Sequence, residues 1–275
     1  MRTSRHTLLA SLRYATIVGA VFVAVFPLVW VLLASFKTPG DLMRLPPTVF
    51  FSPTLENYAT VWRQGFLSFF QNSAIVTIGA VALSVGLGVP AAYGLSRLRI
   101  PGKQAILFFI LSVRFVPYIV FALPLFLLMV GLGLVGTHLG LTLVYVLINL
   151  PVVVWLMKSF FDDIPTDIDD AAAVDGATRF QAFRLVILPS AAAGVACVTI
   201  LSFIFTWNEY MFALILSGRD AQTLTVGLVQ FLGGMENPIR WGLLSASSVT
   251  VLAPVVVVTL LVHKYLREGF SRDTQ

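Results

Sequence analysis

Six long apolar runs, separated by polar segments, make up most of this chain. Stretches of about 18 apolar residues or more are typical of membrane-spanning helices, because about 20 helical residues rising roughly 1.5 Å each cross a hydrocarbon core of about 30 Å. The pattern therefore predicts six membrane-spanning helices. They cover residues 14–35, 69–95, 105–130, 139–157, 191–216 and 243–265.

Composition agrees with this pattern. Hydrophobic residues make up 58% of the 275 residues and charged residues only 11%, and the mean hydropathy is +0.91. Soluble domains carry about 25% charged residues, so an ordinary soluble domain is excluded. The first span is too long for a signal peptide, and no small-x-small cleavage site follows it, so we interpret it as a retained anchor. We expect one all-α integral membrane domain over residues 1–275, with its spans within 14–265.

The distribution of basic residues predicts the orientation. With the N-terminus inside, twelve of the 18 Lys and Arg residues fall in cytoplasmic segments, five fall outside and Arg114 lies within a span. Basic residues accumulate on the cytoplasmic side, so both termini are predicted to be cytoplasmic. Topology and anionic lipid account for the net charge of +5, and no aromatic-and-basic patch favours nucleic acid.

The connections between the spans differ in length. The first outside connection, residues 36–68, carries four prolines and is expected to form a folded lip. The third, residues 217–242, contains Gly233, Gly234 and Pro238 and is expected to fold back toward a pore. Prolines within the third, fourth and sixth spans indicate either ordinary irregularity of the bundle or hinges for a rocking motion.

One acidic segment, residues 162–176, stands out between the apolar runs and holds six of the thirteen acidic residues. Thr166 is positioned to cap a helix, and Asp169 three residues later gives a loose capping box. Acidic side chains in the first turn of that helix are favoured by the helix dipole. Gly176 is suited to the left-handed conformation that ends a helix. A second helix is predicted over Arg179–Leu188, stopped by Pro189, so that two short helices lie at the membrane surface.

The same segment resembles the cytoplasmic signature of binding-protein-dependent ABC importer permeases. That signature reads Glu-Ala-Ala, three residues, Gly, nine residues, Ile, one residue, Leu-Pro. This chain keeps every spacing, with Asp in place of Glu and Val in place of Ile. The matching residues are Asp170, Ala171, Ala172, Gly176, Val186, Leu188 and Pro189.

Further segments extend the resemblance over nearly the whole chain, and they are most similar to maltose-type carbohydrate permeases. Their order and spacing together carry the resemblance. These segments are Ser35-Phe36-Lys37, 54–58, Pro124-Leu125-Phe126, 160–165, Asp175-Gly176-Ala177-Thr178, Trp207-Asn208-Glu209-Tyr210 and 223–228. The usual glycine- and lysine-containing tail is replaced by residues 269–275.

The resemblance implies a type I ABC importer permease fold of six helices, with a cytoplasmic coupling helix within residues 158–190. It implies a permease subunit that moves a carbohydrate across a bacterial or archaeal inner membrane into the cytoplasm. The implied partners are an ATPase dimer, an extracellular sugar-binding protein and a second permease, which is more often a different homologue than an identical copy. The implied ATPase-docking residues are Asp170, Ala171, Ala172, Asp175, Gly176, Leu188 and Pro189.

The chain carries no motif for powering transport by itself. It has no Gly-x-x-x-x-Gly-Lys-Ser/Thr loop, so ATP and Mg²⁺ would bind to the partner ATPase, and the chain is predicted not to be an enzyme. His6, His138 and His263 are dispersed and Cys197 stands alone, so no metal site is expected. A secondary transporter would usually show inverted repeats, and a membrane enzyme would need a constellation of His, Cys or carboxylate groups within the spans; neither is visible.

Polar residues inside the spans are candidates for a substrate path. An ionisable side chain costs about 2.5 to 3.5 kcal/mol at the centre of a membrane helix, so its presence favours a function. Straight helices would separate Arg114 and Glu209 by roughly 13 Å in depth, which disfavours a direct ion pair. Asn208 and Glu209 are expected on one helix about 100° apart. The six candidates are Asn208, Glu209, Trp207, Tyr210, Arg114 and Asn149.

Two alternatives remain for these residues. Arg114 would also be satisfied by snorkelling toward the interface or by pairing with backbone carbonyls. Trp207-Asn208-Glu209-Tyr210 would also suit an interfacial aromatic belt with a capping amide. Sugar recognition is the competing interpretation, because a polyol needs polar side chains with several hydrogen-bonding atoms beside an aromatic face.

Overall fold

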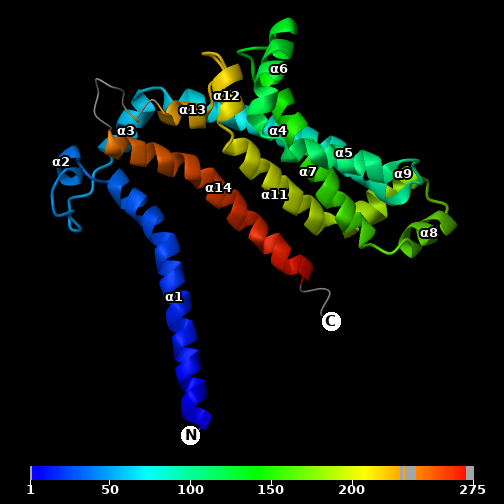
Figure 1. Cartoon of the computed structure of the whole chain (residues 1–275), viewed down its shortest axis with the longest axis horizontal. Coiled ribbons are helices and arrows are strands. Elements are labelled where there is room, and N and C mark those ends of the chain that lie inside the picture. Colours follow the sequence, from blue (N-terminus) through cyan, green and yellow to red (C-terminus); the bar gives the residue numbers. More distant parts are fainter. Residues whose placement is uncertain (1, 230–231, 233–239, 271–275) are drawn as a thin grey trace. The chain divides into compact units, whose positions relative to one another are not determined.

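The computed structural model describes the backbone of residues 2–229, 232 and 240–270, and the side chains of residues 13–229, 232 and 240–261. Over these residues every regular element is a helix (Figure 1). The chain divides into a first unit, Met1–Phe66 with Leu228–Leu252, and a second unit, Leu67–Gly227 with Ala253–Gln275. The glycines and proline of the third outside connection, residues 233, 234 and 238, lie outside the described residues, as does the tail from 271 to 275.

The first unit contains α1 (Arg2–Ser35), α2 (Pro39–Leu42), α3 (Glu56–Arg63) and the beginning of α14 (Trp241–Phe270). The buried Asn57 amide donates to the carbonyls of Ser35 (2.9 Å) and Lys37 (2.8 Å). The Lys37 ammonium is buried as well and donates to the Thr48 carbonyl at 2.6 Å. These side chains hold the backbone between α1 and α3 in place, which confirms the folded lip.

The second unit contains most of the helices. They are α4 (Phe66–Arg97, whose first residue belongs to the first unit), α5 (Lys103–Phe115), α6 (Tyr118–Gly131), α7 (His138–Asp162), α8 (Asp167–Val174), α9 (Arg179–Ala182), the π-helix η1 (Phe183–Ile187), α10 (Leu188–Ser190), α11 (Ala192–Trp207), α12 (Met211–Leu216) and α13 (Leu224–Val229, whose last two residues belong to the first unit).

α7 is the central helix of the second unit. Its buried side chains contribute to two apolar clusters, one around Tyr145 with α12 and one around Phe161 with the π-helix. α4 approaches it closely, because a Cβ atom on Gly88 would lie 2.6 Å from the Val153 side chain. The missing side chain at Gly88 is therefore what allows the α4 and α7 backbones to come together.

The structure confirms four continuous spans and shows that the other two are broken. Helices long and apolar enough to cross a membrane cover Arg13–Ser35, Phe66–Arg97, His138–Asp162 and Trp241–Leu261, and counting each bent pair as one span gives six. The third predicted span is not straight: α5 and α6 meet at 97°. Val116 is extended there (φ −76°, ψ 129°), because the following Pro117 disfavours a helical conformation before it and supplies no N–H.

The fifth predicted span, residues 191–216, is also corrected. α11 ends at Trp207, and α12 begins only at Met211. At its other end, α11 meets the α9–α10 segment at 77°. The prediction that Asn208 and Glu209 lie on one continuous helix is therefore wrong, since both fall in the break.

Candidate functional site

The acidic helix α8 forms where the sequence predicts it, but its N-terminus is built differently. Thr166 has a helical backbone conformation (φ −65°, ψ −22°), and its side chain makes no capping hydrogen bond. A capping side chain needs the extended backbone of a residue outside the helix. Asp169 does not complete a capping box either, because its carboxylate accepts hydrogen bonds from Tyr93 and Arg97 of α4.

The turn that follows α8 confirms the role predicted for Gly176. Its φ of +83° lies in the left-handed region, and there is open space around the position of its missing Cβ. The N–H of Ala177 donates to the carbonyl of Ala172 at 3.0 Å, and the N–H of Gly176 donates to Ala173 at 3.1 Å. This pattern satisfies the last free carbonyls of α8 and reverses the chain sharply.

The second short helix is longer and less regular than predicted. A capping box of Thr178 and Gln181 starts α9, with each side chain accepting from the other residue's backbone N–H. The helix does not stop before Pro189 but continues through η1 and α10 to Ser190. A proline ring clashes with the carbonyl four residues earlier, and the wide π-turn before Pro189 relieves that clash, with Leu188 donating instead to the Phe183 carbonyl.

The docking residues implied by the resemblance lie mostly on the surface of this segment. Asp170, Ala171, Asp175, Gly176 and Pro189 are exposed, Leu188 is half-buried, and Ala172 is buried. Two large apolar side chains join the exposed group, with Val174 87% and Phe180 68% exposed. Acidic and apolar groups are therefore both exposed on this segment, and we call the exposed residues Asp170, Ala171, Val174, Asp175 and Phe180 the α8 face.

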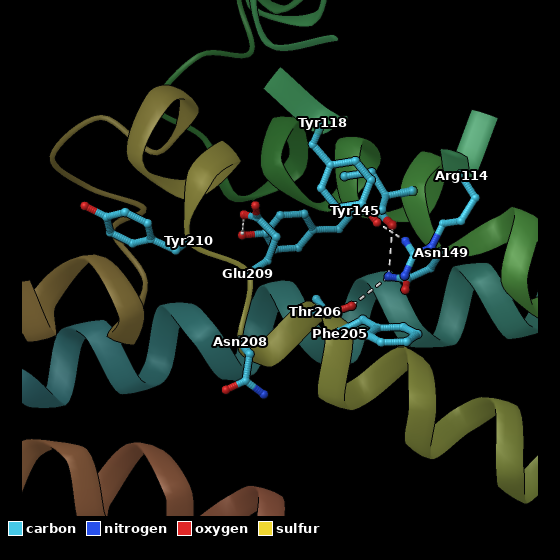
Figure 2. A pocket seen from close by; sticks show the side chains of 10 residues that line it. Arg114, Tyr118, Tyr145, Asn149, Phe205, Thr206, Asn208, Glu209 and Tyr210 are labelled. Carbon is cyan, nitrogen blue, oxygen red and sulfur yellow. Dashed lines mark hydrogen bonds between the residues drawn. The ribbon is translucent and has the colours of Figure 1, made fainter. Parts of the chain in front are cut away.

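A second candidate site is a cavity of about 250 Å³ at the two helix breaks. α5, α6, α7, the end of α11 and the linker before α12 supply its walls (Figure 2). The lining residues are Arg114, Tyr118, Tyr145, Ile148, Asn149, Phe205, Thr206, Asn208, Glu209 and Tyr210. The breaks bring together five of the six substrate-path candidates, all except Trp207.

Glu209 has a structural role in this cavity. Its carboxylate accepts from the Tyr145 hydroxyl at 2.8 Å and from the backbone N–H groups of Phe212 (3.0 Å) and Ala213 (3.1 Å). It therefore caps the N-terminus of α12, where the helix dipole favours a negative charge. These bonds use much of the carboxylate's acceptor capacity, and Glu209 forms no ion pair with Arg114 within the described part of the chain.

Asn149, in the cavity wall, has an unused acceptor. Its side chain is 2% exposed, and its Nδ2 donates to the Tyr145 carbonyl (3.0 Å) and to the Thr206 hydroxyl (2.7 Å). Because a carbonyl can only accept, the bond to Tyr145 fixes which end of the amide is nitrogen. Asn149 Oδ1 has no hydrogen-bond partner among the described residues, which is costly for a buried polar atom.

Arg114 lines the same cavity and is held by aromatic groups. Its Nη1 donates to the Tyr118 hydroxyl, and its guanidinium carbon lies 4.7 Å from the Phe205 ring centroid. Figure 2 shows Arg114, Tyr118, Tyr145 and Asn149 gathered on one side of the cavity. Its further N–H groups add donors to the wall of the same cavity.

The other predicted residues occupy different surroundings. Asn208 caps the end of α11 by donating to the Ile204 carbonyl at 2.9 Å, and Figure 2 shows it and Tyr210 pointing away from the Arg114 group. Trp207 is buried between Phe70 and Phe203, at centroid distances of 5.7 and 5.4 Å.

Sequence reasoning missed two of the three tyrosines of this cavity, Tyr118 and Tyr145. Tyr145 lies four positions before Asn149, which was a detectable signal because such residues share one side of a helix. Tyr118 carried no such signal, because the bend between α5 and α6 separates it from Arg114. No cluster of three or more His, Cys, Asp or Glu side chains suited to a metal ion occurs in the part of the chain that the structure describes.

Comparison with known proteins gives consistent matches over most of the chain. A family model described as binding-protein-dependent transport system inner membrane component matches residues 84–272. The chain is 34% identical to a trehalose/maltose transport system permease protein of Thermococcus litoralis, over 94% of this chain and 95% of that protein. It is 32% identical to a diacetylchitobiose uptake system permease protein of Streptomyces coelicolor, over 96% of this chain and 88% of that protein.

Solved structures show the same architecture. One chain of a bacterial ABC transporter involved in the import of the acidic polysaccharide alginate superposes with a TM-score of 0.79. The match has 25% sequence identity and covers 95% of this chain and 98% of that chain.

Proposed function

We infer the function of this chain from its family, since it belongs to the binding-protein-dependent transport system inner membrane components. Members are ABC transporter permeases, and the chain is a multi-pass inner membrane protein of that kind. We propose that it is one permease subunit of an ATP-driven importer that carries a carbohydrate into the cytoplasm. The observation that carries this proposal is the sharply turned pair of short helices that bears the α8 face and has the spacing of the family signature.

The α8 face is suited to receive an ATPase subunit. It combines carboxylates with two strongly exposed apolar side chains, Val174 and Phe180, and such a mixture is typical of protein interfaces. The chain has no phosphate-binding loop of its own, so ATP and Mg²⁺ belong to that partner. The proposed docking residues are Asp170, Ala171, Ala172, Asp175, Gly176, Leu188 and Pro189.

The substrate class is proposed from relatives and from the cavity. The relatives are named for trehalose, maltose and diacetylchitobiose, which are carbohydrates. Hydroxyl groups of such a substrate both donate and accept, and the cavity wall contains a buried acceptor without a partner at Asn149 and donors at Arg114 beside an aromatic ring. We assign the remaining partners to a second permease subunit, which we expect to be a different homologue, and to an extracellular sugar-binding protein.

Reconstitution tests this function directly. The chain should copurify with an ATPase dimer and a second permease when the three are expressed together. In proteoliposomes, the cognate binding protein loaded with its carbohydrate should stimulate ATP hydrolysis and drive uptake. Copurification without an ATPase, together with uptake driven by an ion gradient, would instead indicate a secondary transporter.

The orientation is proposed from the excess of cytoplasmic basic residues, and cysteine labelling tests it. In a Cys197→Ser background, Ser52→Cys in the lip should react with an impermeant thiol reagent in intact cells. Gln104→Cys, in the first turn of α5, should react only after permeabilisation. Both positions are exposed, so the membrane and not burial controls the reaction. The reverse pattern would contradict cytoplasmic termini.

A further inference from the structure

Asp169 belongs to α8 but does not take part in the α8 face. Its Oδ2 accepts from Arg97 Nε at 2.8 Å and its Oδ1 accepts from the Tyr93 hydroxyl at 2.8 Å. Arg97 Nη2 also donates to the Ile164 carbonyl at 2.8 Å. The Arg97 and Asp169 side chains are 12% and 19% exposed, so the pair is largely shielded from water. It joins α8 to the last turn of α4.

Aromatic packing reinforces this junction. The Tyr93 ring lies 4.8 Å from Phe183 of η1 and 5.6 Å from Phe161 of α7, measured between ring centroids. Phe161 is fully buried and Phe183 nearly so. The end of α4 therefore contacts α8 through the Arg97–Asp169 pair, and it contacts η1 through the packed ring of Tyr93.

The opposite end of α4 is fixed by polar side chains as well. Asn72 Nδ2 donates to the backbone carbonyls of Asp220 (2.9 Å) and Gln222 (3.0 Å). The Leu224 N–H donates to Ser73 Oγ at 2.8 Å. The segment from Asp220 to Leu224 leads into α13, which begins at Leu224. In the predicted topology this segment lies on the other side of the membrane from α8.

We propose that the Arg97–Asp169 pair is a positioning link that transfers movement of the ATPase-docking helix α8 to α4, and through α4 to the segment 220–224. This inference rests on the proposed function. α4 suits the task because it runs as one helix of 32 residues, roughly 48 Å at about 1.5 Å per residue. A charge-assisted, largely buried pair resists sliding, because separating it leaves both charges without partners.

The test uses the reconstituted complex with its ATPase and binding protein. Asp169→Asn should still copurify with the ATPase and keep basal ATP hydrolysis, because Asp169 faces away from the α8 face. Carbohydrate imported per ATP hydrolysed should fall about tenfold, since α8 would move without carrying α4. The matched control is Asp167→Asn, which removes an exposed carboxylate from the same helical turn and should leave this ratio unchanged.

Exchange of the charges separates a positioning role from a general loss of folding. Arg97→Asp and Asp169→Arg should each lower the import ratio, and the double variant should recover most of it. A double variant no better than the single ones would overturn the link. A normal import ratio in Asp169→Asn would also overturn the link. So would a fall in that ratio that a lower melting temperature of the variant fully explains. If the wild-type complex shows no stimulation by loaded binding protein, the proposed function fails, and the link fails with it.

Discussion

Gly176→Val is expected to abolish transport while leaving the membrane helices intact. Gly176 has a φ of +83°, and no other group lies within 4 Å of the position of a Cβ atom, so the valine meets strain and not a clash. A left-handed conformation costs a β-branched residue about 1 to 2 kcal/mol. Relief of that strain would open the turn between α8 and α9 and displace the α8 face. Uptake and binding-protein-stimulated ATP hydrolysis should both be lost.

Two variants control this prediction. Gly102→Val places the same strain at a φ of +72°, also in open space, but in the turn before α5. It should leave ATPase docking intact. Gly176→Asn should retain much of the activity, because asparagine tolerates the left-handed region better than valine does. Full transport by Gly176→Val would contradict the docking role proposed for this segment.

The features predicted correctly from the sequence are those with local causes. The continuous spans follow from length and hydropathy alone, and Gly176 follows from the rule that a helix often ends at a left-handed glycine. Pro117 carried a visible signal for the bend between α5 and α6. The capping box of Thr178 and Gln181 at α9 had a local signal too, but no cap was predicted there, whereas the cap predicted for α8 at Thr166 has the right position but no side-chain hydrogen bond.

The features that sequence reasoning missed depend on partners far along the chain. No proline or glycine marks the end of α11 at Trp207. The Glu209 carboxylate instead starts a new helix at α12 and is held there by Tyr145, which lies 64 positions earlier. Asp169 likewise leaves its expected capping position for Arg97, which is 72 positions away. A charged partner outcompetes a local backbone bond, and only the folded chain identifies that partner.

The same logic changes which cavity residue should matter most for transport. Glu209 and Asn208 looked most suited to hold a sugar, yet both side chains bond to backbone groups at helix ends. Asn149 keeps a buried oxygen without a partner among the described residues, and it lines the same cavity as Arg114. A substrate hydroxyl donating to Asn149 Oδ1 would satisfy that oxygen.

Asn149→Leu is therefore expected to lower carbohydrate uptake strongly. Loss of a hydrogen bond to a buried polar partner costs about 1 to 3 kcal/mol, which corresponds to roughly tenfold to a hundredfold in rate or affinity. Leucine fills a similar volume and the carbonyl of Tyr145 keeps its place within α7, but the buried Thr206 hydroxyl loses the Asn149 donor, so the melting temperature of the complex should fall as well. Initial uptake rates over a range of substrate concentrations, measured beside the melting temperature, give both quantities.

Ser202→Ala is the matched control for that variant. Ser202 is also buried, its hydroxyl also lacks a partner among the described residues, and it lies on α11 one turn from Thr206 but not in the cavity wall. It should transport normally. If Asn149→Leu and Ser202→Ala behave alike, the free oxygen of Asn149 is no more than a packing defect. If only Asn149→Leu fails, and uptake per folded complex falls more than the lower melting temperature explains, the cavity between the two helix breaks lies on the carbohydrate's path, since Asn149 lines that cavity and Ser202 does not.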